Sequence, residues 1–289
     1  MLQRTIFRPA LPWLFALALA AGCGDGGATG GGDVSGRDVP DNPDPPRSSF
    51  TAEDHVSGAE FSKLTIEVDF VTQRGPDGTA LSELQAALDQ LRADGQLAKP
   101  GGVEFVLDDV LDPSPADKVW TLGELQALAQ GYRDHPLDAT AAAIHVLYVD
   151  GHYQDDTAQG TVLGFAYGGS WMVMFKDNIT DACASSTVIS GPVLSGLRDK
   201  ICSRAEATVL LHELGHLFGL VNNGTPMVVA HEDPDHAKHD ADKDCLMYWA
   251  IERSTAVDIV AEGFVGGTPQ LGFCATSLAD LEAVASPGQ

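Results

Sequence analysis

Residues 210–222, LLHELGHLFGLVN, combine two histidines and a glutamate at a spacing that can bind a metal ion and use it. His212 and His216 are four residues apart, so on a helix both imidazoles project from one face. Two neutral imidazoles in this arrangement can bind one Zn²⁺ ion. Glu213 follows the first histidine directly, where its carboxylate can take a proton from a metal-bound water and pass it to a leaving amine. These residues predict a catalytic metal centre with Glu213 as general base.

A third protein ligand is needed to complete a catalytic zinc site of this kind. The stretch resembles the core of the metzincin clan of zinc endopeptidases, HExxHxxGxx followed by His or Asp, in which that last residue is the third ligand. This position holds Asn222, whose neutral carbonyl is a poor zinc ligand. The residue types leave four interpretations open: a site without a third protein ligand, or one completed by a later histidine, which is His231, His236 or His239.

The segment around Met247 carries a second resemblance. The spacing of His239, Cys245 and Met247 is similar to that of archaemetzincins, a metzincin branch in which a Cys and the methionine of the Met-turn follow the third His. The resemblance implies His239 as third ligand, displaced by an insertion at residues 222–238, and Met247 as the floor beneath the metal. The further cysteines that bind a second zinc in that branch are lacking, so one catalytic zinc ion is expected.

The elements that must position these residues follow from hydrophobic periodicity. Alternating, β-branched segments predict strands at 63–71, 102–110 and 141–151, and two more within 161–175 joined at a Gly-Gly turn. Apolar residues at helical spacing predict helices at 80–95, 121–132 and 205–218. This order predicts an α/β sandwich with a mixed sheet.

The helix that carries the histidines has predicted boundaries of its own. Ser203 and Glu206 match a capping box at its start, and Gly219 matches a C-terminal turn. The metzincin resemblance implies a zincin fold around it: a mostly parallel sheet with an antiparallel edge strand, this long active-site helix, and a C-terminal subdomain with the Met-turn and a helix.

Composition narrows the classes of partner. Of the 289 residues, 17 are basic and 41 acidic, a formal net charge of -24. Such a chain repels nucleic acid and anionic membrane surfaces, so neither is an expected partner. The carboxylates near His231, His236 and His239 could bind Ca²⁺, but the favoured interpretation is a solvated acidic loop. These carboxylates are Glu232, Asp233, Asp235, Asp240, Asp242 and Asp244.

The N-terminus predicts export. Residues 1–22 combine two arginines with a short apolar run, which is typical of a signal peptide. The sequence LAAGC, ending at Cys23, resembles the lipobox of bacterial lipoproteins, which implies a lipid on that cysteine and an anchor in the cell envelope. Residues 23–58, rich in Gly, Asp and Pro, predict a flexible linker, and residues 59–289 the catalytic domain.

An exported chain with four further cysteines is expected to form two disulfides. Three pairings are possible, and we predict the local pairs Cys183–Cys202 and Cys245–Cys274. The function that the sequence predicts is a monomeric, zinc-dependent endopeptidase acting on proteins or peptides. Two alternatives remain: a non-catalytic, zinc-stabilised surface lipoprotein, and a zinc hydrolase of a non-peptide amide or ester.

Overall fold

The computed structural model describes residues 50–134, 140–158, 160–266 and 271–286. The chain divides into two compact units, residues 1–45 and 46–289, and all described residues belong to the second. The predicted signal peptide, Cys23 and the linker up to residue 49 lie outside the described part. None of the helices in the described part is both long and apolar enough to cross a membrane.

A five-stranded sheet lies at the centre of the second unit, with strand order β2-β1-β4-β7-β6. Its strands are β1 (Lys63–Val71), β2 (Gly102–Leu111), β4 (Ala141–Val149), β6 (Gly164–Tyr167) and β7 (Trp171–Phe175). All neighbouring pairs are parallel except β6 and β7, which form an antiparallel hairpin at one edge. The mostly parallel sheet with an antiparallel edge strand is therefore confirmed. A separate two-stranded sheet pairs β3 (Val119–Trp120) with β5 (His152–Tyr153).

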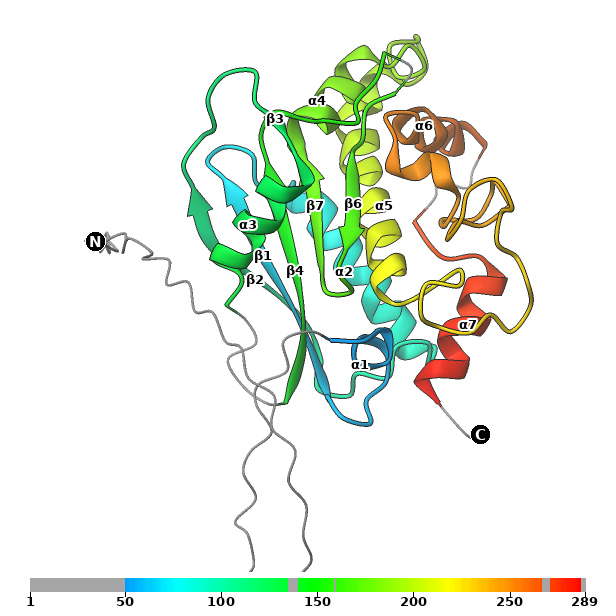
Figure 1. Ribbon diagram of the computed structural model, residues 1–289. Coiled ribbons are helices and arrows are strands. Elements are labelled where there is room, and N and C mark those ends of the chain that lie inside the picture. Colours follow the sequence, from blue (N-terminus) through cyan, green and yellow to red (C-terminus); the bar gives the residue numbers. More distant parts are fainter. Residues whose placement is uncertain (1–49, 135–139, 159, 267–270, 287–289) are drawn as a thin grey trace, which may run out of the picture. The chain divides into compact units, whose positions relative to one another are not determined.

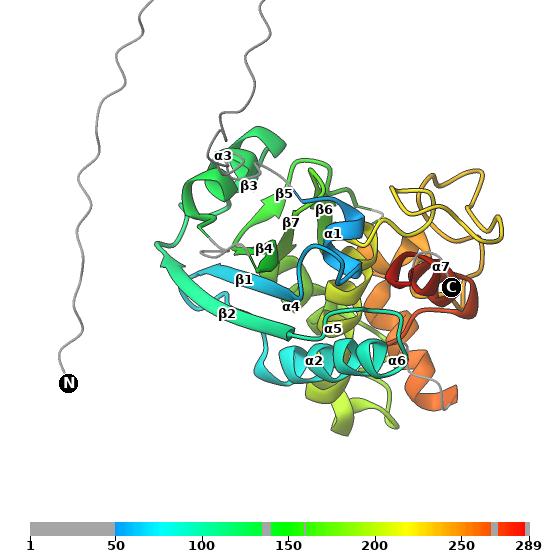
Figure 2. The same ribbon diagram turned by 90° about the horizontal axis from the view of Figure 1, so that it is seen from below.

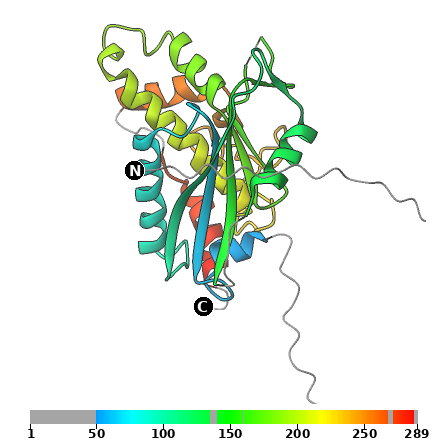
Figure 3. The same cartoon turned by 90° about the vertical axis from the view of Figure 1, so that its left-hand side faces the viewer.

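Helices cover both faces of this sheet (Figures 1 and 2). The α-helices of the described part are α1 (Ala52–Val56), α2 (Gly78–Ala93), α3 (Leu122–Tyr132), α4 (Lys176–Ser185), α5 (Arg198–Leu217), α6 (Ala256–Gly266) and α7 (Ala275–Ala285), and its 3₁₀ turns are η1 (Ser195–Leu197) and η2 (Trp249–Glu252). Helices α2 and α5 pack on one face and α3 lies on the other, which Figure 3 shows edge-on. The sheet is thus the middle layer of three.

The apolar residues of the strands explain this layering. Along β1, Leu64, Ile66 and Val68 alternate toward the core that α2 and α5 share, and Val71 joins a second core beside α3. Strand β4 is buried along its whole length, as expected for a central parallel strand covered on both faces. The continuous apolar run at residues 141–149 is therefore explained by the central position of β4 in the sheet.

The predicted start of the long helix is wrong. Helix α5 begins at Arg198, so Ser203 and Glu206 lie inside it, both buried. The Glu206 carboxylate accepts hydrogen bonds from the Tyr148 hydroxyl at 3.0 Å and the Lys176 ammonium at 2.5 Å. The S-x-x-E pattern therefore belongs to a buried network between α5 and its neighbours. The helix ends at Leu217, and Gly219 adopts a φ of 79°, which confirms the predicted turn.

The predicted linker extends too far. Thr51 caps α1 through a capping box, and Phe50 and Val56 are buried in the main core together with Phe61. Residues 50–58 are therefore part of the folded unit. The Gly, Asp and Pro content that marks the preceding segment ends before these residues, which supply apolar side chains for burial.

A buried lysine fixes this N-terminal segment to the sheet. Lys99 is 1% exposed, and its ammonium donates to the backbone carbonyls of Asp54 at 2.6 Å, Ser57 at 2.5 Å and Phe61 at 2.8 Å. Burial lowers the pKa of Lys99 to about 8. One buried side chain thus binds three backbone carbonyls and holds residues 54–61 in place.

We expect Lys99→Met to lower the free energy of unfolding by about 3 kcal/mol or more, because it removes three buried hydrogen bonds from a charged donor. The control is Lys63→Met, which removes an ion pair to Glu104 that is half exposed and contributes under about 1 kcal/mol. Urea denaturation followed by circular dichroism measures both. Equal losses in the two variants would contradict the assigned role of Lys99.

Acid sensitivity is expected from His55. Its Nδ1 donates to the Leu217 carbonyl at 3.0 Å, and burial lowers the pKa of this histidine from 6.5 to about 4. Between these pH values the unfolded chain binds the extra proton and the folded chain does not, so stability falls as pH falls. The difference corresponds to about 3 kcal/mol. Urea denaturation of wild type and His55→Gln at pH 7 and pH 4 measures the effect. The free energy of unfolding should fall less between these pH values in the variant, and equal falls in both proteins would contradict the role of His55.

Candidate metal centre

Helix α5 brings His212, Glu213 and His216 to one side, where they face the loop that follows the helix. His212 and Glu213 are fully buried. The Nε2 atoms of His212 and His216 lie 3.2 Å apart. In a tetrahedral zinc site with Zn–N distances of about 2.0–2.1 Å, ligand nitrogens lie about 3.3 Å from each other. The helix alone therefore places the Nε2 atoms of His212 and His216 at the separation expected of two ligands in a tetrahedral zinc site.

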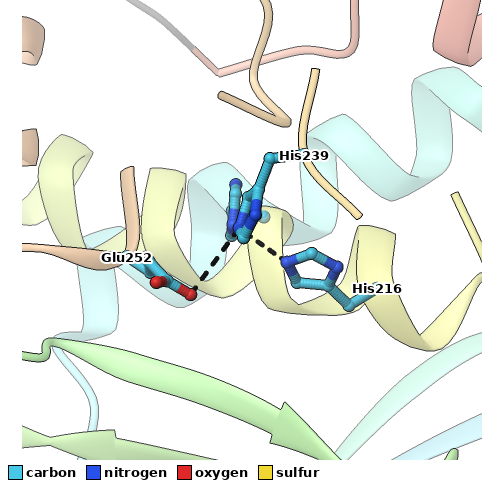
Figure 4. Close-up of side chains that lie close together, drawn as sticks. His216, His239 and Glu252 are labelled. Atoms are coloured by element: carbon cyan, nitrogen blue, oxygen red, sulfur yellow. Dashed lines mark hydrogen bonds and ion pairs between the residues drawn. The ribbon is translucent and has the colours of Figure 1, made fainter. Parts of the chain in front are cut away.

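The loop after the helix returns a third histidine to this pair. The ring of His239 stacks on that of His212, with centroids 5.4 Å apart, and stands nearly perpendicular to His216 at 4.9 Å. Glu252, from η2, completes the group: one potential ligand atom from each of these four residues lies within 4.8 Å of the others (Figure 4). The structure thus brings together the two histidines of the helix and His239, the residue that the archaemetzincin resemblance implies.

Hydrogen bonds to the backbone fix which ring nitrogens face the cluster. His212 Nδ1 donates to the Leu246 carbonyl at 2.7 Å, and His239 Nδ1 donates to the Ala237 carbonyl at 3.1 Å. In the neutral rings the Nε2 atoms therefore carry lone pairs; His212 Nε2 lies 3.2 Å from His216 Nε2, and His239 Nε2 lies 3.7 Å from the Glu252 carboxylate. Metal-ligating histidines are oriented by this kind of outer hydrogen bond.

Electrostatics favour the neutral, ligating form of the helix histidines. Burial lowers the pKa of His212 to about 4, and burial together with His212 and His239 lowers the pKa of His216 well below its usual value. Burial, followed by the nearby Glu252, raises the pKa of Glu213, and the Ala166 amide only partly offsets this. The Ala166 amide approaches the Glu213 carboxylate, but neither oxygen receives a hydrogen bond of normal geometry. Converging lone pairs beside buried carboxylates fit a divalent cation, which would satisfy all of them at once.

The loop that separates the helix from His239 has a defined path. After the turn at Gly219, Val221 and Asn222 adopt positive φ angles of 53° and 60°. The Asn222 amide donates to Glu232 at 3.0 Å and takes no part in the cluster. Residues 222–238 therefore form an inserted loop, which leaves the end of α5 and returns the chain to the cluster at His239.

Met247 lies directly under the histidines of the helix. Its sulfur packs against Gly215, where an added Cβ would come within 2.4 Å of it. The carbonyl next to it, of Leu246, orients His212, and the Met247 carbonyl accepts from Asp240, the neighbour of His239. This short segment therefore supports ligands from both the helix and the loop.

The other late histidines are engaged elsewhere. Both ring nitrogens of His231 pair with carboxylates, Nδ1 with Asp240 at 2.5 Å and Nε2 with Asp280 at 2.9 Å. His236 pairs with Asp233 and stacks on a tryptophan, at a centroid distance of 4.5 Å. Neither belongs to the cluster around His212. The alternatives His231 and His236 are therefore not supported by the geometry.

The acidic loop uses its carboxylates locally. Asp233 and Asp242 accept hydrogen bonds from the backbone amides two residues ahead, and Asp240 holds His231. Among described residues, no group suited to a metal consists of this loop's carboxylates; Asp240 is grouped only with Cys245 and Cys274.

The predicted cysteine pairs both lie at disulfide distance, with Cα separations of 5.9 Å for Cys183–Cys202 and 4.9 Å for Cys245–Cys274.

Glu252 is the member of the cluster that the sequence did not indicate. It follows Met247 by five residues in a 3₁₀ turn, and no spacing rule connects it to the helix motif. Its backbone carbonyl accepts from the amide of Leu163, the residue that precedes β6, at 2.9 Å. Together with the bridge between Val162 and Arg253, this bond ties the segment before the edge strand to the turn that carries Glu252.

The edge strand β6 runs beside the cluster. Gly164 lets β6 approach α5, because an added Cβ there would meet Val209 at 3.3 Å and Met174 at 2.8 Å. Past its last residue, a cavity of about 310 Å³ opens between the β6–β7 turn and His216, with Lys238 at its rim. The site therefore borders both a strand edge and a hollow of side-chain size.

No family model and no curated protein matches this sequence. Among solved structures the chain is similar to metalloproteinase-II from Bacteroides fragilis, with a TM-score of 0.40 and 12% sequence identity over 79% of this chain and 54% of that one. The chain thus spans about half the length of that protein. At this level of similarity the match carries no residue roles, and the candidate site rests on its own geometry.

Proposed function

We propose that this chain is a zinc-dependent endopeptidase of metzincin type. The observation that carries the proposal is the convergence of three imidazole Nε2 atoms, from His212, His216 and His239, beside the buried carboxylate of Glu213. Three histidines are the protein ligands of one class of catalytic zinc sites. A bound Zn²⁺ ion supplies Lewis acidity toward a carbonyl and lowers the pKa of a bound water.

The chain's own residues supply the remaining chemistry. Glu213 is fully buried directly beside the imidazoles, where a bound cation would hold it as the carboxylate that takes a proton from a water and returns it to a leaving amine. The Leu246 and Ala237 carbonyls hold two of the imidazoles in the ligating tautomer. Met247 and Gly215 set the floor on which these groups are fixed.

The neighbouring edge strand favours a peptide as substrate. Strand β6 pairs with β7 on one side only, and its residue Ala166 lies close enough to Glu213 to influence its pKa. An extended peptide can pair with such a strand edge through its backbone. The cavity beside His216 would then take a side chain of that peptide.

Two other functions remain as alternatives, and Glu213 distinguishes the first. A zinc-stabilised surface lipoprotein without activity has no use for a buried carboxylate beside the metal. A zinc hydrolase of a non-peptide amide or ester would keep the same centre, and only the substrate separates it from an endopeptidase. Export, the lipid on Cys23 and a monomeric state complete the proposal from the sequence.

Metal removal tests the core of this proposal. The purified protein should cleave members of a peptide library at internal bonds, lose this activity on treatment with a chelator such as 1,10-phenanthroline, and regain it when Zn²⁺ is added. Mass spectrometry of the digest measures the cleavage, and elemental analysis measures the metal. Zinc bound without any peptide cleavage would favour the surface lipoprotein or the non-peptide hydrolase.

A further inference from the structure

Glu252 is held with one carboxylate oxygen inside the histidine cluster. Its Oε1 lies 3.5 Å from Arg253 Nε, and its Oε2 lies 3.7 Å from His239 Nε2. The backbone of the same residue is fixed to β6 through Leu163. The side chain is largely covered, with 21% of its surface exposed. Glu252 is therefore placed and oriented toward the same point as the three imidazoles.

A hydrogen bond to His239 does not explain this placement. The distance of 3.7 Å exceeds a hydrogen bond, and His239 Nε2 is buried without a partner. His239 already donates from Nδ1 to Ala237, so its Nε2 carries a proton only if the ring is charged. His239 Nε2 and a Glu252 oxygen thus face the same point as the nitrogens of His212 and His216, and one cation there would contact all four residues.

We propose that Glu252 is a fourth protein ligand of the metal centre, so that the resting site is a closed His₃Glu set. Carboxylate oxygens bind zinc at about the same distance as imidazole nitrogens, which places ligand atoms about 3.3 Å apart. The observed separations of 3.2 Å between His212 and His216 and 3.7 Å between His239 and Glu252 approach this edge length.

This inference rests on the proposed metal centre and adds a requirement for opening it. A carbonyl oxygen or an added ligand would compete with the Glu252 carboxylate for a bound ion. The side chain stands on a short 3₁₀ turn, and an ion pair with Arg253 remains available when it leaves the ion. A substrate that pairs with β6 contacts the strand whose start is bonded to the Glu252 backbone, so the two sites are structurally connected.

The test uses the full chain loaded with Co²⁺, which reports its ligands in the visible spectrum, and acetohydroxamate as the added ligand. If Glu252 occupies the ion most of the time, acetohydroxamate binds only the fraction of molecules in which Glu252 is off the ion. Removing Glu252 therefore raises the apparent affinity for acetohydroxamate by the inverse of that fraction. We expect Glu252→Ala and Glu252→Gln to bind acetohydroxamate about ten-fold more tightly than wild type. Their Co²⁺ affinity should fall by about ten-fold or more.

Glu213→Gln is the matched control for charge. It also removes one carboxylate beside the ion, but from a residue that is not in the ligand cluster. If it tightens acetohydroxamate binding as much as Glu252→Gln does, relief of repulsion explains the effect and the fourth ligand is excluded. Unchanged Co²⁺ affinity in Glu252→Ala also overturns the proposal.

The readout separates this inference from the endopeptidase proposal. No peptide is used, so a chain that binds Co²⁺ and shows the Glu252 effect but cleaves no peptide refutes only the proposed activity. A chain that cleaves peptides but binds acetohydroxamate equally well with and without Glu252 refutes only the fourth ligand. A chain that binds no Co²⁺ refutes both.

Discussion

Glu213→Gln should reduce peptide hydrolysis by about 10²–10⁴-fold, the range expected when a general base is lost. The amide keeps the size of the carboxylate but accepts no proton, so turnover falls while the fold and the bound metal persist. The effect should appear in kcat rather than in KM, because the side chain acts on the proton transferred and contributes little to binding of the ground state. Steady-state cleavage of a fluorogenic peptide, with metal content measured in parallel, gives both quantities.

The matched control for this variant is Glu262→Gln. Glu262 lies on α6 and is exposed, so its replacement removes the same charge away from the cluster. Its activity should equal that of wild type. Retention of full activity in Glu213→Gln would refute the assignment of Glu213 as base and would leave the metal centre without a proton acceptor of known identity.

His239→Ala should lower zinc affinity by about 100-fold or more, because loss of even an outer-shell partner costs 10–100-fold and this change removes a ligand. Activity should fall with the metal and should not return fully when excess Zn²⁺ is supplied, since the remaining histidines no longer fix the geometry. Competition with a chromophoric chelator measures the affinity directly.

His236→Ala is the control for this second change. His236 lies three residues before His239, is paired with Asp233 and stays outside the cluster. Its removal should leave zinc affinity within about two-fold of wild type, given the small effect of exposed ion pairs. Were His236→Ala to lose zinc while His239→Ala kept it, the ligand set drawn from the geometry would be wrong.

Much of the fold could be predicted from local patterns. The strands at 63–71 and 141–149 and the hairpin at 164–175 follow from β-branched runs and a Gly-Gly turn, signals that depend on neighbours in sequence. The start of α5 could not, because Ser203 and Glu206 match a local capping rule while their actual partners come from other elements. A residue pattern cannot distinguish a cap from a buried network when both use the same side chains.

The disulfide pairs illustrate the same division. Proximity in the chain favours Cys183–Cys202 and Cys245–Cys274, and the structure has both pairs at bonding distance. The first pair links α4 to α5, and the second links the Met247 segment to the start of α7. Short-range closure costs the least chain entropy, which is why the local pairing was the better prediction.

Residue spacing was enough to predict how the two imidazoles and the carboxylate of α5 are arranged, because the pitch of a helix fixes how residues at positions i, i+1 and i+4 project. The spacing of His239, Cys245 and Met247 indicated the later histidine through a family resemblance, and the fold places it beside the pair, whereas Glu252 was found from the fold alone. These residues reach the cluster through a loop and a 3₁₀ turn, whose paths depend on contacts with β6, Asp240 and the Met247 segment. Such contacts have no period along the chain, so no spacing in the sequence encodes them.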